Sequence, residues 1–307
     1  MRKKLGRILP WVVTLVLLFY VFHGLSFADM KAALAAAESW AVPVLALLVI
    51  GIYLGDSFAI WKTFGWFVAK LSFREVLVVR GATYLLALVN YTVGQGAIVY
   101  FVNRSRGVPI LRGTAAVLLV MGINILLLLV FASIGLLVAP DLPPVVRQVV
   151  FGAYGALALY LVLLVSRPRW LTSRPIFDVL FAAGVAGHLR ALLVRVPHIG
   201  ILMVFSYASL RAVGVQLPIS QAILYLPIIY FIAVLPISVM GLGVNQLTMA
   251  YFFFKYVPNH TPEDARKLIE MASLGAQAVA LVVQVGLGLF CMRNQIARGL
   301  EPPASTA

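Results

Sequence analysis

Six stretches of this chain are apolar over about the length that crosses a lipid bilayer. Because a membrane helix needs about 20 mostly apolar residues, we expect full spans near residues 8–25, 43–62, 113–138, 148–166, 197–214 and 269–292. The chain is 63% hydrophobic and 11% charged, whereas soluble domains are about 45–50% apolar and about 25% charged. The alternating segments of an outer-membrane barrel are missing from the sequence. The sequence therefore predicts an all-α polytopic membrane protein.

Two further apolar segments, near residues 81–103 and 220–256, are interrupted by short glycine-centred breaks. The breaks are Leu88–Gly96 and Leu235–Gly243. An unwound backbone in lipid leaves N–H and C=O groups unpaired, so such breaks persist only where protein or a water-filled cavity satisfies them. Paired interrupted segments in the two halves of a chain indicate the binding site of a transporter.

The distribution of Lys and Arg predicts how these segments are oriented. Short cytoplasmic loops gather Lys and Arg, and four of these residues crowd the N-terminus, so we place it inside. Continuing span by span puts 18 of the 24 Lys and Arg residues inside, with Arg80 and Arg195 among those in cytoplasmic loops, and balances the other six against six acids outside. The net charge of +14 is then explained by topology, and nucleic-acid binding is not expected. Both termini are expected in the cytoplasm of a cell with this protein in its inner (plasma) membrane.

The same rule distinguishes the two broken segments. Basic residues flank 81–103 on both sides, whereas 220–256 is followed by an electrically neutral stretch at 261–267. We therefore expect two re-entrant helical hairpins, the first entering from the cytoplasm with a turn around residues 90–96, and the second entering from outside. Such a pair is an inverted repeat whose tips meet near the bilayer midplane. The alternative is that each broken segment is an ordinary span or pair of spans.

The ends of the chain and one internal segment need separate interpretation. The apolar stretch 8–25 is longer than the 7–15 residues of a signal-peptide core, so we expect an uncleaved first helix. Residues 1–300 are assigned to a single integral membrane domain, and 301–307 to a short polar tail. The segment 176–196 is amphipathic, and we expect it to lie flat on the inner leaflet as a linker or a lipid-gathering helix. The single cysteine, Cys291, excludes an internal disulfide.

Asp56 lies well inside the predicted span 43–62. An acid at membrane depth is costly and is a candidate functional residue by default. The candidate partners toward the cytoplasmic side are Lys62, Arg80 and Arg112. Asp56 is interpreted either as half of a structural ion pair or a cap to a neighbouring hairpin, or as a residue for coupling, for gating or for binding a positively charged headgroup.

Uncharged amide side chains at membrane depth form the second candidate set. They are Asn90, Gln95, Asn124, Asn245, Gln246, Gln277 and Gln284. Amides both donate and accept hydrogen bonds, so they either hold helices together or bind a phosphate or sugar headgroup. The substrate-binding residues expected at the hairpin tips are Asn90, Gly94, Gln95, Gly96, Pro236, Gly241, Gly243, Asn245 and Gln246. Half-helix N-termini at these tips favour an anionic group.

Sequence motifs of catalysis are missing. There is no HExxH, GxSxG, P-loop or nucleotide fingerprint. The four histidines are scattered without metal-ligand spacing, and they are expected to snorkel or to be solvated near the membrane interfaces. We therefore expect no catalytic residue, no metal, no cofactor and no enzymatic activity. A membrane-embedded transferase is the least favoured function, because Asp56 is the one acid predicted at membrane depth.

The two breaks and their flanks form a pattern seen in a known family. The pattern consists of Asn90, Gly94, Gly96, Tyr100, Phe101, Gly107 and Pro109, followed by Pro236, Gly241, Gly243, Asn245 and Gln246. It resembles the lysylphosphatidylglycerol synthase transmembrane-region family, the flippase-like membrane half of bacterial multiple peptide resistance factors. The resemblance covers residues 8–295 and implies a polytopic protein that moves or handles lipids or lipid-linked glycans.

Three positions depart from the family pattern. The family's first patch has a Pro-Gly turn followed by an acid, whereas this chain has Val93 and no acid after Gly96. The second patch of the family ends in Glu, where this chain has Gln246. The missing carboxylates favour a neutral or anionic lipid over a cationic, lysylated headgroup.

The leading hypothesis is a bacterial inner-membrane translocator of lipids or lipid-linked headgroups, with a polar site at the two hairpin tips. Its expected partners are membrane lipids, including anionic lipids or lipid-linked glycans. The alternative is a non-transporting accessory protein that scaffolds an envelope-lipid or glycan synthesis enzyme. Lipid movement in reconstituted vesicles distinguishes the two hypotheses.

Overall fold

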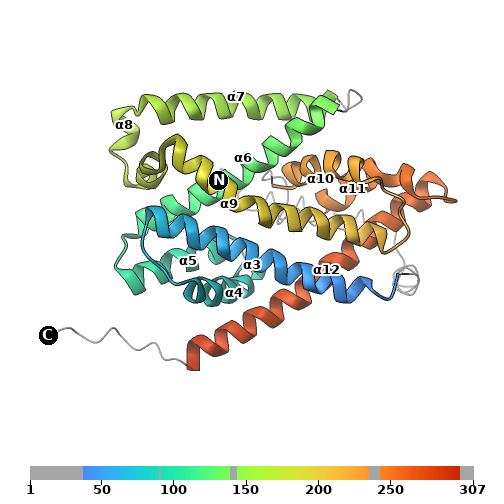
Figure 1. The fold of residues 1–307 in the computed structure, drawn as a ribbon, viewed down its shortest axis with the longest axis horizontal. Coiled ribbons are helices and arrows are strands. Elements are labelled where there is room, and N and C mark those ends of the chain that lie inside the picture. The colour runs from blue at the N-terminus through green and yellow to red at the C-terminus, as the bar shows by residue number, and fades with distance from the viewer. Residues whose placement is uncertain (1–36, 90, 139–143, 235–242, 298–307) are drawn as a thin grey trace, which may run out of the picture. The chain divides into compact units, whose positions relative to one another are not determined.

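The computed structural model describes residues 37–89, 91–138, 144–234 and 243–297 (Figure 1). These residues form helices and short 3₁₀ turns, and they contain no strand. The helices are α3 (Ala41–Phe67), α4 (Phe73–Val89), α5 (Tyr91–Arg106), α6 (Ile110–Val138), α7 (Pro144–Ser166), α8 (Arg169–Thr172), α9 (Asp178–Arg211), α10 (Ile219–Val234), α11 (Val244–Phe253) and α12 (Pro262–Ala297). The 3₁₀ turns are η1 (Pro175–Phe177) and η3 (Phe254–Tyr256).

Five stretches of the described residues are long and apolar enough to cross a membrane. They are Ala41–Phe67, Ile110–Ile134, Val146–Ser166, Pro175–Arg211 and Pro262–Arg293. The prediction of an all-α polytopic membrane protein is thereby confirmed. The expected span at 8–25 lies outside the described residues.

The segment 176–196 differs from the flat helix expected from its sequence. It belongs mostly to α9, which continues through Pro197 to Arg211 and is broken only at Gly184, where φ is 54° and ψ is −172°. This positive φ favours glycine, so the chain changes direction there, eight residues into the segment rather than at its end. Residues 185–196 are therefore continuous with the helix that was predicted to begin at 197.

The chain divides into two compact units, and each contains one of the broken segments. One unit, called the α4–α5 unit here, comprises Val49–Leu127, Phe151–Ile201 and Leu281–Ala307. The other, called the α10–α11 unit, comprises Met1–Leu48, Leu128–Val150 and Leu202–Ala280. Each unit has its own buried apolar cluster, centred on residues such as Phe64 and Val102 in the first and Phe253 in the second.

The first broken segment is a helical hairpin whose two ends are tied together. The hydroxyl of Ser72 accepts from the N–H of Glu75 at 3.2 Å while the Glu75 carboxylate accepts from the N–H of Ser72 at 2.7 Å, which is a capping box at the start of α4. At the end of α5, Arg106 pairs with the Glu75 carboxylate at 2.6 Å and donates to the Lys70 carbonyl at 3.2 Å. Burial opposes the charge on Glu75, but the bonds from Ser72 and Arg106 outweigh it and hold the pKa of this carboxyl below its usual range.

Neither arm of this hairpin is long enough to span a bilayer. Helix α4 has 17 residues and α5 has 16, which is about 25 Å each at about 1.5 Å per residue, against a hydrocarbon core of about 30 Å. The two arms pack side by side (Figure 1). The turn is shorter than the 90–96 predicted from the glycines, because α4 ends at Val89 and α5 begins at Tyr91. Gly94 and Gly96 are therefore helical.

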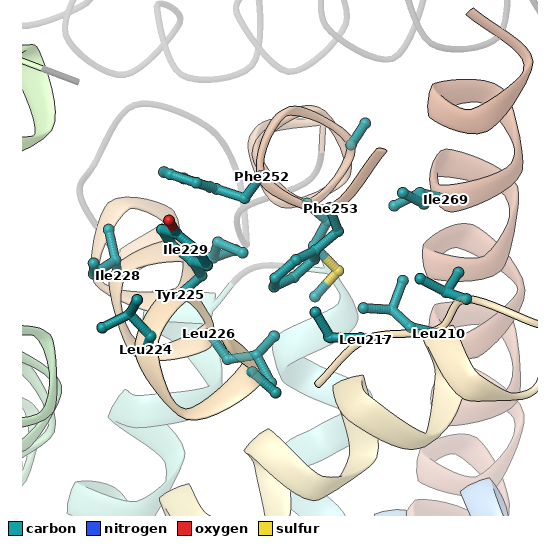
Figure 2. Packing of buried hydrophobic residues seen from close by; sticks show 14 of the residues in the cluster. Leu210, Leu217, Leu224, Tyr225, Leu226, Ile228, Ile229, Phe252, Phe253 and Ile269 are labelled. Atoms are coloured by element: carbon teal, nitrogen blue, oxygen red, sulfur yellow. The ribbon is translucent and has the colours of Figure 1, made fainter. Parts of the chain in front are cut away.

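The second broken segment is also closed at its base. Helices α10 and α11 pack together, and the backbone N–H of Gln216, before α10, donates to the carbonyl of Tyr256, after α11, at 2.9 Å. Tyr225 of α10 stacks on Phe252 of α11 with ring centroids 4.8 Å apart. Figure 2 shows these rings beside Phe253, which packs toward Ile269 of α12. The arms have 16 and 10 residues, so each is shorter than a span.

The tied bases predict that each hairpin returns to the side of the membrane from which it starts. In a background with Cys291→Ala, single cysteines at the exposed positions Lys70 and Arg104 should label from the same face as each other, and those at Gln216 and His260 should also label from one common face. Labelling of right-side-out and inside-out vesicles with an impermeant maleimide measures this. Labelling of Lys70 and Arg104 from opposite faces would show that α4 and α5 cross the membrane instead.

The close packing of α4 against α12 in the α4–α5 unit predicts a steric defect at Gly81. A Cβ at Gly81 would collide with the Cys291 sulfur and lie 2.9 Å from its Cβ. Gly81→Ala should therefore lower the free energy of unfolding by about 1–3 kcal/mol, and Cys291→Ala should recover part of that loss. Thermal unfolding in detergent measures the effect. Gly286→Ala is the matched control, since its Cβ meets nothing within 4 Å, and an equal loss in that variant would refute the collision.

Candidate functional site

The α4–α5 unit contains a buried cluster of charged side chains from four helices. The Asp56 carboxylate on α3 forms two ion pairs. Its Oδ2 pairs with Arg80 of α4, and its Oδ1 pairs with Arg195 of α9 at 2.5 Å. Arg195 also donates its Nε to the Asn124 Oδ1 of α6 at 2.5 Å. The side chains of Asp56, Arg80 and Arg195 are 2%, 13% and 5% exposed, so these ion pairs are withdrawn from water.

Two glycines allow α3 and α9 to approach closely enough for this cluster to form. A Cβ at Gly55 would lie 3.1 Å from the Cα of His198, and one at Gly51 would lie 3.3 Å from the Ile201 side chain. Small residues four apart let helix backbones come close in a membrane. The close contact places Arg195, one turn before His198, beside Asp56.

The aromatic residues of α3 and α4 complete the surroundings of the cluster. Tyr53 and Tyr84 have ring centroids 5.7 Å apart, and the Arg80 guanidinium lies 5.3 Å from the Tyr84 ring centre. Tyr53 donates its hydroxyl to the Leu77 carbonyl at 2.5 Å, which ties α3 to α4 a second time. These contacts hold α3 and α4 together beside the cluster.

The predicted partner Arg80 of Asp56 is confirmed, and the other two candidates are engaged elsewhere. Lys62 lies 4.2 Å from the centre of the Trp61 ring, and Arg112 pairs with Asp178 at 3.5 Å. Sequence reasoning missed Arg195 and assigned both Arg80 and Arg195 to cytoplasmic loops. The Gly51-x-x-x-Gly55 spacing just before Asp56 is the sequence signal that could have indicated a close partner helix. A coupling or gating role for Asp56 stays a prediction.

The tip residues of the first hairpin are only partly described. Asn90 lies outside the described residues, while Gly94 is buried, Gln95 is half-buried and Gly96 is exposed on α5. A Cβ at Gly96 would meet nothing within 4 Å. No side chain therefore covers α5 at Gly96, in the second turn of the helix.

The tip of the second hairpin contains a well-defined polar group at the start of α11. Pro236 and Gly241 lie outside the described residues. Gly243 has a φ of 81° and precedes the helix, its N–H donates to the Gln246 Oε1 at 2.8 Å, and the Gln246 amide donates to Gln277 of α12 at 3.1 Å. Gln246 is completely buried, so this amide joins the hairpin tip to α12.

Among the described residues of this tip, Asn245 has an unsatisfied acceptor. Its Oδ1 is buried and has no hydrogen-bond partner among the described residues. A buried acceptor without a partner costs about 1–3 kcal/mol, so such an atom needs an explanation. A hydrogen-bond donor on a bound ligand or a water molecule would explain the unpaired oxygen of Asn245.

Two histidines lie deeper in the protein than the sequence suggested. His188 is 7% exposed; its Nδ1 donates to the Gly184 carbonyl and its Nε2 accepts from Tyr160, both at 2.6 Å. His198 is half-buried and bonds the Ile52 carbonyl through Nδ1 at 3.1 Å. The expectation of solvated histidines is therefore wrong for His188. Its role is to hold α7 against the bend at Gly184.

Neither comparison with known proteins nor a search for metal-binding groups assigns a function to this site. Comparisons with protein-family models, curated proteins and solved structures found no match. Within the described residues, no group of three or more His, Cys, Asp or Glu side chains is placed to hold a metal ion. The family resemblance stays a prediction.

The bond between Gln246 and Gln277 predicts energetic coupling between the hairpin tip and α12. Gln246→Leu and Gln277→Leu should each destabilise the protein, and the double variant should lose less than the sum by about 0.6–2 kcal/mol. Thermal unfolding of all four proteins in one detergent measures this coupling. Gln284→Leu paired with Gln246→Leu is the control, and equal coupling in that pair would contradict the assignment.

Proposed function

We propose that this protein moves lipids or lipid-linked headgroups across the membrane that contains it. The observation that carries the proposal is the pair of closed helical hairpins, α4–α5 and α10–α11, whose arms are shorter than a membrane span. Hairpins of this kind end at membrane depth rather than crossing it. The backbone and side chains at their tips are then available to a polar group inside the bilayer.

The polar groups of the second tip support this function. A headgroup that leaves water needs hydrogen-bonding partners along its path, because an unpaired polar group in hydrocarbon costs several kcal/mol. The buried Asn245 Oδ1 offers an acceptor, and the first N–H groups of α11 offer donors. Gln246 holds this arrangement in place through Gly243 and Gln277.

The charge pattern of the sequence supports opposite orientations of the two hairpins. The residues at the base of α4–α5 include Lys70, Arg104 and Arg106, whereas the stretch after α11 balances its basic residues with acids. Basic loops remain in the cytoplasm. A pair of hairpins opening to opposite faces suits alternating access, in which a headgroup is taken up on one side and released on the other.

The tip residues are expected to be necessary for lipid movement. Asn245→Leu and Asn90→Leu should each reduce the rate of lipid translocation at least about tenfold, because each removes an amide that partners the headgroup. The measurement is the translocation of a fluorescent phospholipid in reconstituted vesicles, read by dithionite quenching of the outer leaflet.

The matched control for this experiment is Thr248→Val on the same helix. The Thr248 hydroxyl donates to backbone carbonyls of its own helix, at 2.7 Å to Val244 and at 3.2 Å to Asn245, so its loss removes no side-chain amide from the tip and should leave the rate close to that of the unmodified protein. Normal rates in both asparagine variants would reject the tips as the site. No translocation by the unmodified, folded protein would favour the accessory role with an envelope-lipid or glycan synthesis enzyme.

A further inference from the structure

Four polar side chains recur along one face of α12, within a stretch that is long and apolar enough to cross a membrane. They are Arg266, Glu270, Ser273 and Gln277, and their spacing of four, three and four residues places them one above the other on a helix. This set, called the polar row here, is about 16 Å long at about 1.5 Å per residue. All four residues belong to the α10–α11 unit.

The contacts at the two ends of the polar row show which neighbour it faces. At one end the Arg266 guanidinium lies 4.7 Å from the centre of the Phe254 ring, in the 3₁₀ turn that follows α11. At the other end Gln277 accepts from the amide of Gln246, in the first turn of α11, at 3.1 Å. The two middle members lie between these contacts, so the polar row runs beside α11 from the base of the hairpin to its tip.

Ser273, in the middle of the polar row, has an unused hydroxyl group. The residue is 5% exposed, and no hydrogen bond joins its hydroxyl to any described residue. A serine within a helix commonly donates to a carbonyl of the preceding turn, as Ser209 of the same unit does to Ser206 at 2.8 Å. Buried polar groups are paired in folded proteins, so the Ser273 hydroxyl calls for a partner other than the described residues.

Gln277 has a second unused group, and the neighbouring hydrogen bonds decide which one it is. The backbone N–H of Gly243 can only donate, so the Gln246 side chain accepts from it through Oε1 at 2.8 Å. Gln246 then faces Gln277 with its Nε2, and Gln277 accepts through its own Oε1. The Nε2 of Gln277 is left without an acceptor among the described residues. It belongs to the residue one turn from Ser273 on the same face of α12.

We infer that the polar row binds the hydroxyl groups of a lipid headgroup, a sugar or a glycerol, as it moves between the membrane surface and the α10–α11 tip. The inference rests on the proposed function and names the chemistry of the headgroup. The Gln277 amide offers a donor, and the Ser273 hydroxyl both donates and accepts. A hydroxyl group of a ligand also donates and accepts, so it satisfies either residue.

The charges along the polar row favour hydroxyl groups over a phosphate or an ammonium group. The two charged members, Arg266 and Glu270, have opposite signs and lie one turn apart toward the base of the hairpin. The two members toward the tip, Ser273 and Gln277, are uncharged. A charged group beside them meets no opposite charge from the row, and a charge withdrawn from water without a partner is costly. Hydroxyl groups need hydrogen bonds alone.

The polar row is closed in this structure, because α11 contacts α12 at both of its ends. A headgroup reaches Ser273 only when α11 moves away from α12. The bond between Gln246 and Gln277 is then replaced by bonds to the ligand, so opening of the hairpin and binding of the headgroup are coupled.

Ser273→Ala tests the inference, because the hydroxyl makes no bond within the described residues whose loss would unfold the protein. The unfolding temperature without lipid should stay the same or rise, since the substitution removes an unpaired polar group. Binding of a glucosyl diacylglycerol should weaken about three- to tenfold, because one hydrogen bond to the ligand is lost. A serine that serves only as a small packing residue predicts unchanged binding, and that outcome would overturn the inference.

The measurement is the rise in unfolding temperature of the purified full chain as lipid is added, in a detergent without sugar groups. Glucosyl diacylglycerol is compared with phosphatidylmethanol of the same acyl chains, which carries a charged phosphate and no hydroxyl group, and with the diacylglycerol itself. The glucosyl lipid should give the largest shift, and its shift alone should depend on Ser273. An equal loss of the phosphatidylmethanol shift in Ser273→Ala would show that the row binds phosphate and would overturn the inference.

Ser209→Ala is the matched control for this experiment. Ser209 belongs to the same unit and is 4% exposed, but its hydroxyl already donates to the Ser206 carbonyl. This variant should bind the glucosyl lipid normally. Equal weakening in the two serine variants would show a general effect of removing a buried hydroxyl and would contradict the proposed site.

The binding measurement also separates this inference from the proposed function. Hydroxyl-dependent binding through Ser273 in a protein that moves no lipid would retain the polar row as a binding site and reject translocation. Lipid movement by a protein whose binding of the glucosyl lipid is unchanged in Ser273→Ala would retain translocation and reject the polar row.

Discussion

The carboxylate of Asp56 joins α4 and α9 to α3 through ion pairs that water cannot replace. In a soluble protein a broken pair is rehydrated, so exposed pairs contribute little. Inside a membrane protein water does not reach the same charges. Removing one partner leaves the other charge buried and unpaired, which destabilises the protein by about 3–5 kcal/mol. The packing of the α4–α5 unit depends on this constraint, because the helices that supply Asp56, Arg80 and Arg195 must stay together for any of the three to be buried.

Each of the two hairpins is closed at its base by hydrogen bonds. Lipid tails give no hydrophobic reason for one helix to prefer another, so hydrogen bonds at the base of each hairpin fix its geometry. Arg106 closes α4–α5 and the Gln216 to Tyr256 bond closes α10–α11. Apolar packing such as that of Tyr225 on Phe252 then fills the space between the arms.

The features that depend on local composition, the long helices and the two hairpins, could be predicted from the sequence. The contacts between residues far apart in the chain could not. Apolar length located the long helices, and glycine breaks located both hairpins, because these signals lie within single segments. The pair between Asp56 and Arg195 joins residues 139 apart, and the charge rule counted Arg195 as a loop residue because it cannot distinguish a buried arginine near a helix end from an exposed one. The turn around 90–96 was predicted too long for a related reason: Gly94 and Gly96 interrupt hydropathy without interrupting the helix.

The nature of the polar groups bears on which headgroups such a protein favours. At the second tip an amide at Gln246 accepts from Gly243 and also donates to Gln277. A glutamate there would keep the first bond, and the second would require the Gln277 amide to turn and donate to the carboxylate. In the other unit the Asp56 carboxylate is occupied by two arginines. Neither site, as far as its described residues extend, offers a free carboxylate to a cation, and the first N–H groups of α11 favour an anion. Under the proposed function, a negatively charged headgroup is therefore expected to suit these residues better than a cationic one.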